Sequence, residues 1–218
     1  MAAAVSAAAL VAGAYSANAA NVVLNDVGGV TGTPAEQGFQ IAAAFWGAIL
    51  ADDVTINIDV GFGELGPGIL GGAQSNAVVV TTAGYYNALA FDATSNLDVS
   101  AVTNLEALDA AGGVTAITPG YEDPVNQTGI DTNITIVDSD GSNNNAFTVV
   151  NNANFKALGG TIDGADANVT FNSLASFDFD PSDGIDAGAS DFVGVAIHEI
   201  GHALGFTCLL YTSDAADE

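Results

Sequence analysis

Residues 192–206 read FVGVAIHEIGHALGF and form the most informative stretch of the chain. Its apolar residues recur at helical spacing: Val193, Ala196, Ile197, Ile200 and Leu204. Ser190 or Asp191 can cap the start of such a helix, and Gly205 suits a left-handed stop. The sequence therefore predicts an amphipathic helix with a buried apolar side.

The polar residues of this helix form the pattern H-E-x-x-H at His198, Glu199 and His202. Histidines four residues apart project from one helix face, so both imidazoles can reach one zinc ion at about 2.0–2.1 Å. Glu199 lies about 100° around the helix, within reach of a water activated by the metal. Zinc lowers the pKa of such a water to about 7, and the carboxylate then takes its proton as the water attacks a peptide carbonyl. The alternative is that the only two histidines of the chain are ordinary core residues.

Three other segments have clear periodicity. Residues 34–50 place Phe39, Ala42, Ala43, Trp46 and Leu50 on one helical face, with Pro34 at the start. Residues 54–60, VTINIDV, and 167–172, ANVTFN, alternate as half-buried strands do. Together these segments predict an α+β domain with a hydrophobic core.

A glycine-rich loop spans residues 61–72 and includes G-x-G-x-x-G at Gly61, Gly63 and Gly66. A dinucleotide site requires the last glycine to open a helix that holds the pyrophosphate. Pro67-Gly68 follows at once, and no βαβ repetition appears later. We therefore interpret the segment as a connecting loop.

Residues 138–145, DSDGSNNN, have turn chemistry and predict a hairpin between strands at 134–137 and 147–150. The D-x-D-G start is similar to calcium loops, but the ligand spacing and final Glu of an EF-hand are missing. Both a solvated turn and a calcium site are compatible with this composition.

The composition is strongly acidic: 26 Asp and Glu against one basic residue, Lys156, for a formal net charge of −25 over 218 residues. Binding to nucleic acid or to an anionic membrane relies on Lys and Arg, so both are unfavourable here. The length fits one domain. Such a charge suits a protein in saline or calcium-containing surroundings, where cations screen the repulsion.

The N-terminus predicts export. Residues 2–15 are small and apolar, and Ala17-Asn18-Ala19 forms an A-x-A pattern before Ala20. This arrangement is typical of a secretory signal peptide, although the basic start of such a leader is missing. We expect a leader at 1–19 and a secreted or cell-surface protein without a transmembrane segment in its mature chain.

The segment HEIGHALGF resembles the zinc metallopeptidases of the metzincin clan, whose pattern is H-E-x-x-H-x-x-G-x-x-H/D. More narrowly, residues 39–71 and 167–206 resemble secreted bacterial metalloproteases related to matrixins. The resemblance implies an N-terminal catalytic subdomain at 20–207, with a twisted mixed sheet and two long helices, the second bearing the zinc histidines.

The resemblance implies two further features. A sheet-edge strand, expected within 167–172, would pair with an extended protein or peptide substrate. The acidic loop at 178–186 is similar in position to calcium loops of the clan, with Asp178, Asp180, Asp183 and Asp186 as ligands. The alternative for this loop is an acidic entry into the helix.

The chain departs from the clan after Gly205. The third zinc ligand, His or Asp, stands six residues after His202 in the clan, where this chain has Cys208. Residues 208–218, CLLYTSDAADE, resemble the translation of a transposase adaptor used in sequencing libraries, so we expect native sequence to end at Thr207. The methionine turn and C-terminal subdomain of the clan are also missing, since Met1 is the only methionine.

These observations predict a zinc endopeptidase with Glu199 as general base, in a chain that is itself inactive because its metal site and cleft are incomplete. The alternative is a noncatalytic, acidic, calcium-binding surface protein with a degenerate peptidase fold. Zn²⁺, and Ca²⁺ at the acidic loop, are the expected cofactors.

Overall fold

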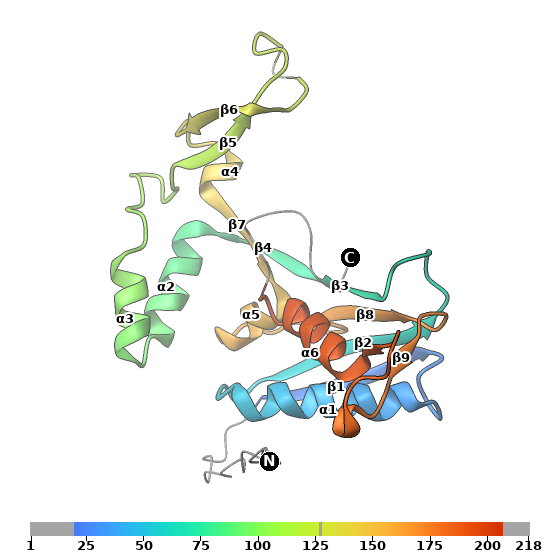
Figure 1. Cartoon of the computed structure of the whole chain (residues 1–218). Coiled ribbons are helices and arrows are strands. Elements are labelled where there is room, and N and C mark those ends of the chain that lie inside the picture. The colour runs from blue at the N-terminus through green and yellow to red at the C-terminus, as the bar shows by residue number, and fades with distance from the viewer. Residues whose placement is uncertain (1–19, 127, 207–218) are drawn as a thin grey trace, which may run out of the picture.

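A four-stranded mixed sheet organises the computed structural model, which describes residues 20–126 and 128–206 (Figure 1). Strands β1 (Asn21–Gly28), β2 (Thr55–Gly63) and β8 (Ala167–Asn172) are parallel, and β3 (Gly71–Ser75) pairs antiparallel with β8. The strand order is β1-β2-β8-β3, so β1 and β3 are the edges. The predicted α+β class with a mixed sheet is confirmed. The expected leader at 1–19, Thr207 and the tail from Cys208 lie outside the described residues.

Helix α1 (Pro34–Ile49) connects β1 to β2 and begins as predicted, with Pro34 in its first turn. Phe39, Ala42 and Ala43 are buried, while Trp46 is half-buried. In β2 the alternating residues Ile56, Ile58 and Val60 are buried, also as predicted, but the strand continues to Gly63 into the expected loop.

The hydrophobic core lies between the sheet and two helices, α1 and α6 (Phe192–Ala203), which pack against each other. Three buried phenylalanines join the layers: Phe39 of α1, Phe171 of β8 and Phe192 of α6. The Phe39 ring lies 5.1 Å from that of Phe171 and 5.2 Å from that of Phe192, centroid to centroid. This cluster anchors the start of α6 on the sheet.

A buried ion pair stands beside the sheet. Asp166, fully buried just before β8, accepts hydrogen bonds from Lys156 Nζ and the Asn57 backbone N–H, both at 2.7 Å. Lys156 belongs to α5 (Asn152–Ala157) and is the only basic side chain of the sequence. The one lysine therefore compensates a carboxylate that the fold removes from water.

Residues 77–151 form an arm that projects from the sheet beyond β3 (Figure 1). Its base is the pair β4 (Ala77–Thr81) and β7 (Phe147–Asn151), and a second pair, β5 (Ala116–Gly120) and β6 (Asp131–Asp138), lies farther out. The arm also contains three helices: α2 (Thr82–Asp92), α3 (Asn96–Thr103) and α4 (Asn143–Ala146). Two-stranded ribbons cover little apolar surface, so Ile117, Val137 and Val149 remain largely exposed.

The predicted hairpin between 134–137 and 147–150 is wrong. In β6, Val137 is opposite Ile117 of β5, and in β7, Val149 is opposite Val79 of β4. Helix α4 occupies part of the expected turn. Alternation identifies a strand but not its partner, and here each strand pairs with one that is distant in sequence.

The prediction that the substrate-pairing edge lies within 167–172 is also wrong. These residues form β8, as expected, but β8 is paired on both sides, with β2 and β3. Edge and central strands share the same alternation, so sequence alone did not separate them. The edge next to α6 is β3.

The chain enters α6 through a short connection. Strands β9 (Phe177–Asp178) and β10 (Ser190–Asp191) pair with each other, and the 3₁₀ turn η1 (Pro181–Asp183) lies in the loop between them. Among the described helices, none has the length and apolar character needed to cross a membrane.

Candidate metal centre

Helix α6 carries the H-E-x-x-H residues on the predicted element. Phe192, Ala196, Ile200 and Ala203 are buried, and Ile197 is half-buried. Asp191 stands at the N-cap position, but its side chain makes no capping hydrogen bond. Burial of the apolar face, rather than the cap, holds the start of the helix.

The helix ends at Ala203, with Leu204 as its C-cap, directly before the glycine that the sequence predicted as its stop. Gly205 has a φ of +98°. Its N–H donates to the His202 carbonyl, and the Phe206 N–H donates to the Gly201 carbonyl, both at 3.0 Å. This pair of bonds is a Schellman motif, and it turns the backbone of Phe206 back toward the last helical turn.

The two histidines face each other. Their Nε2 atoms are 2.9 Å apart, and the ring planes are nearly perpendicular. His202 Nδ1 lies 2.7 Å from the backbone oxygen of Phe206. A carbonyl only accepts, so this contact places the proton on Nδ1 and leaves the Nε2 lone pair of a neutral His202 directed at His198.

Glu199 projects to a different side of the helix from the exposed His198, as the sequence predicted, and its side chain is only 2% exposed. Burying a carboxylate is unfavourable unless hydrogen bonds or positive charge compensate it. His198 and His202 thus lie one turn apart on the helix, and the carboxylate of Glu199, the residue after His198, is buried.

Elements distant in sequence support the last turns of α6. Trp46 Nε1 donates to the Ile197 carbonyl at 2.8 Å, and the Ser75 hydroxyl of β3 donates to the His202 carbonyl at 3.1 Å. The sequence marked Trp46 only as a core residue of α1 and did not mark Ser75. Trp46 and Ser75 are 151 and 127 residues before the carbonyls that they bind, and no local sequence pattern predicts contacts over such separations.

In the acidic loop at 178–186, backbone N–H groups of the loop itself bind the carboxylate of Asp178. Asp178 is buried, and its two oxygens accept the N–H groups of Asp180 and Asp186 at 2.9 and 2.8 Å. Hydrogen bonds from Ser182, first its side chain and then its backbone, lower the pKa of Asp180. Asp180, Asp183 and Asp186 are exposed, and calcium binding here stays a prediction.

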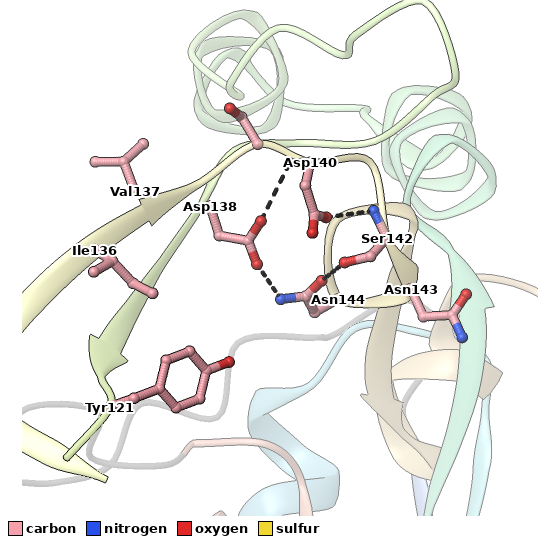
Figure 2. A pocket seen from close by; sticks show the side chains of 9 residues that line it. Tyr121, Ile136, Val137, Asp138, Asp140, Ser142, Asn143 and Asn144 are labelled. Carbon is pink, nitrogen blue, oxygen red and sulfur yellow. Dashed lines mark hydrogen bonds between the residues drawn. The ribbon is translucent and has the colours of Figure 1, made fainter. Parts of the chain in front are cut away.

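A second acidic loop lines the cavity between β6 and α4, with a volume of about 870 Å³. Figure 2 shows Asp138, Asp140, Ser142 and Asn144 directed toward one another. Asp138 accepts from the Asp140 backbone and the Asn144 amide, and Asp140 accepts from the Ser142 backbone. These bonds hold the loop that leads from β6 into α4, in place of the hairpin turn expected from the sequence, and calcium here also stays a prediction.

Within residues 20–126 and 128–206, no three His, Cys, Asp or Glu side chains form a group that could hold a metal ion. Among these residues, the imidazoles of His198 and His202 therefore form a pair.

The glycine-rich segment is a connection, as interpreted from the sequence. Gly61 and Gly63 belong to β2, and no helix follows before β3. The Asn172 side chain accepts from the Leu65 N–H and donates to the Ile69 carbonyl, which holds the loop against β8.

No protein-family model matches the chain, and neither do any curated proteins or solved structures.

Proposed function

We propose that the chain carries the N-terminal part of a zinc-dependent endopeptidase of the metzincin type, exported from the cell. The observation that carries the proposal is the imidazole pair on α6: two Nε2 atoms 2.9 Å apart, with His202 held by the Phe206 carbonyl. Neutral histidines oriented by a carbonyl at the other ring nitrogen are the usual form of zinc-ligating histidines.

The pair fits zinc with a small adjustment. Two nitrogens at about 2.0–2.1 Å from a tetrahedral ion are about 3.3 Å apart, a few tenths of an ångström more than the separation seen here. His198 is exposed, so a small rotation of its ring is sufficient. Zinc bound there would also bring positive charge to the helix turn that contains buried Glu199, which lowers the unfavourable energy of that burial.

Each residue then has a chemical role. His198 and His202 would hold the zinc ion, which would supply Lewis acidity toward a water and a peptide carbonyl. Glu199 accepts the proton of the attacking water and returns it to the departing amine. The Phe206 carbonyl keeps the His202 proton on Nδ1, so that this imidazole remains a neutral ligand.

The sheet supports the same proposal. Strand β3 is an antiparallel edge that packs against α6, and its Ser75 hydroxyl bonds to the helix beside His202. An extended polypeptide added to this edge would run alongside the histidines. We assign to β3 the substrate-pairing role that the resemblance to metzincins had suggested for residues 167–172.

The proposal can be tested with a variant that adds the third zinc ligand of the metzincin pattern. Cys208→His installs the third histidine of the metzincin pattern, and we expect it to tighten zinc binding by about tenfold or more relative to Cys208→Ala. Zinc affinity is measured by competition with a chromophoric chelator. Equal affinity of the two variants would contradict the metzincin assignment.

The unchanged chain should not cleave casein, because catalytic zinc sites use three protein ligands and residues 20–126 and 128–206 bring together only the two histidines of α6. Cleavage that Glu199→Ala abolishes would refute this expected inactivity. Folding that needs calcium but is indifferent to zinc and to both histidines would instead favour the noncatalytic calcium-binding alternative.

A further inference from the structure

Trp46 is the only tryptophan of the chain, and it packs from α1 onto the metal-site turn of α6. A Cβ added to Gly201 would lie 2.9 Å from Cζ2 of the indole. Gly201 stands between the two histidines, directly before His202. The absence of a side chain at 201 therefore lets the indole lie against the helix backbone at the level of the site.

The first contact is a hydrogen bond to the residue before His198. Trp46 Nε1–H donates to the Ile197 carbonyl at 2.8 Å. In a regular helix this oxygen also accepts the N–H four residues later, and a carbonyl has two lone pairs for these two donors. The indole thus fixes the peptide unit that joins Ile197 to His198.

The second contact reaches His202 through one intermediate residue. The indole stacks on the Phe206 ring, with centroids 5.1 Å apart and planes at 22°. The backbone of Phe206 is held at its N–H by the Gly201 carbonyl, and its own carbonyl accepts the His202 Nδ1 proton. A side chain that restrains Phe206 therefore restrains the group that sets the His202 tautomer.

We propose that Trp46 is a positioning residue for the metal site, acting on His198 through the Ile197 carbonyl and on His202 through Phe206. This inference rests on the proposed zinc function and extends it to a residue on a different helix. The α1–α6 contact is then part of the site as well as part of the core, and a change on α1 alters metal affinity without touching a ligand.

Two variants separate the two contacts. Trp46→Phe keeps an aromatic ring against Phe206 but loses the bond to Ile197, whereas Trp46→Leu loses both. We expect zinc affinity to fall several-fold in the first variant and roughly 10- to 100-fold in the second, the range for residues that orient metal ligands. Ile49→Ala removes an exposed apolar side chain from the same helix and should leave the affinity unchanged.

A second readout excludes a merely structural effect. Nitrogen-15 NMR of the imidazoles in the metal-free protein should show His202 protonated at Nδ1 in the wild type, and a mixture of tautomers in Trp46→Leu. Ile58→Val loosens the core within β2, where Ile58 is fully buried, and should lower stability without changing the tautomer. Partial recovery of affinity in Trp46→Phe relative to Trp46→Leu would support the stacking contact.

The outcomes also separate this inference from the proposed function. Zinc binding that is lost in His198→Ala but unchanged in both Trp46 variants, with an unchanged His202 tautomer, would overturn the role of Trp46 alone. Zinc binding that is the same in the wild type and in His198→Ala would overturn the zinc site, and the inference with it.

Discussion

The ammonium group of Lys156 allows the carboxylate of Asp166 to remain charged inside the fold. Asp166 is fully buried, and the Lys156 side chain is 12% exposed, so the pair is largely removed from water. Removing one member of a buried pair leaves an uncompensated charge, which is far less favourable than removing both. In a sequence with 26 acidic residues, the single lysine is thus held inside the fold.

Lys156→Met should lower the free energy of unfolding by about 3 kcal/mol, because the Asp166 carboxylate would remain buried without its ammonium partner. Urea unfolding followed by circular dichroism measures the change. The double variant Lys156→Met/Asp166→Asn has no buried charge and should recover part of the loss. A Lys156→Met protein as stable as the wild type would contradict this interpretation of the ion pair.

At the scale of elements, the sequence predicted the parts that have strong periodicity. Helix α1, strands β2 and β8, and helix α6 were located within a few residues, because each buries one regular face against the core. Helix α3 (Asn96–Thr103) has no buried residue and so lacks a regular face of this kind. Its capping box, formed by Ser95 and Asp98, was a readable signal that the prediction missed.

The strand order, the strand partners and the residues that support the histidines were not predicted from the sequence, because they depend on contacts between distant elements. The order β1-β2-β8-β3 and the pairing of β6 with β5 follow from long-range registers. The histidine pair was predictable because both ligands share one helix, four residues apart. The supporting residues Trp46 and Ser75 were not, because their role exists only once α1 and β3 pack on α6.

The turn from β1 into α1 provides a pH-dependent test at this scale. Asp26 accepts hydrogen bonds from the Thr31 hydroxyl and from the backbone N–H groups of Thr31, Gly28 and Val30. The Thr31 side chain makes the largest contribution, and these bonds lower the pKa of Asp26 from 3.8 to about 2. The folded pKa lies below the unfolded one, so the stabilisation is present above about pH 4 and is lost as the pH falls toward 2.

Asp26→Asn should therefore lower the urea midpoint at pH 7 and lose less stability than the wild type between pH 4 and pH 2. Asp53→Asn removes the same charge from an exposed position after α1 and serves as the control. Wild type and Asp26→Asn curves that remain parallel from pH 7 to pH 2 would contradict the role of this turn.

At the scale of the whole molecule, charge repulsion is the dominant long-range term. A formal net charge of −25 with one basic side chain opposes the compact state. Salt shortens the range of this repulsion, from about 30 Å at 0.01 M to about 10 Å at 0.1 M. The molecule should therefore be more stable in saline surroundings, which agrees with the proposed export.

Raising NaCl from 10 mM to 500 mM should increase the melting temperature, measured by circular dichroism. A constant or falling melting temperature would contradict the importance of repulsion. Calcium chloride at equal ionic strength separates screening from binding: a larger increase than with NaCl supports the predicted calcium sites, and an equal increase contradicts them.

The proposed function depends first on the zinc site that His198 and His202 form together. Its most direct test is a zinc titration of the purified chain by isothermal calorimetry, alongside His198→Ala, His202→Ala and Glu199→Gln. We predict one zinc per wild-type chain, loss of that binding in either histidine variant, and retention in Glu199→Gln, whose side chain is assigned to proton transfer rather than to the metal. Binding that persists unchanged in both histidine variants would contradict zinc binding by His198 and His202.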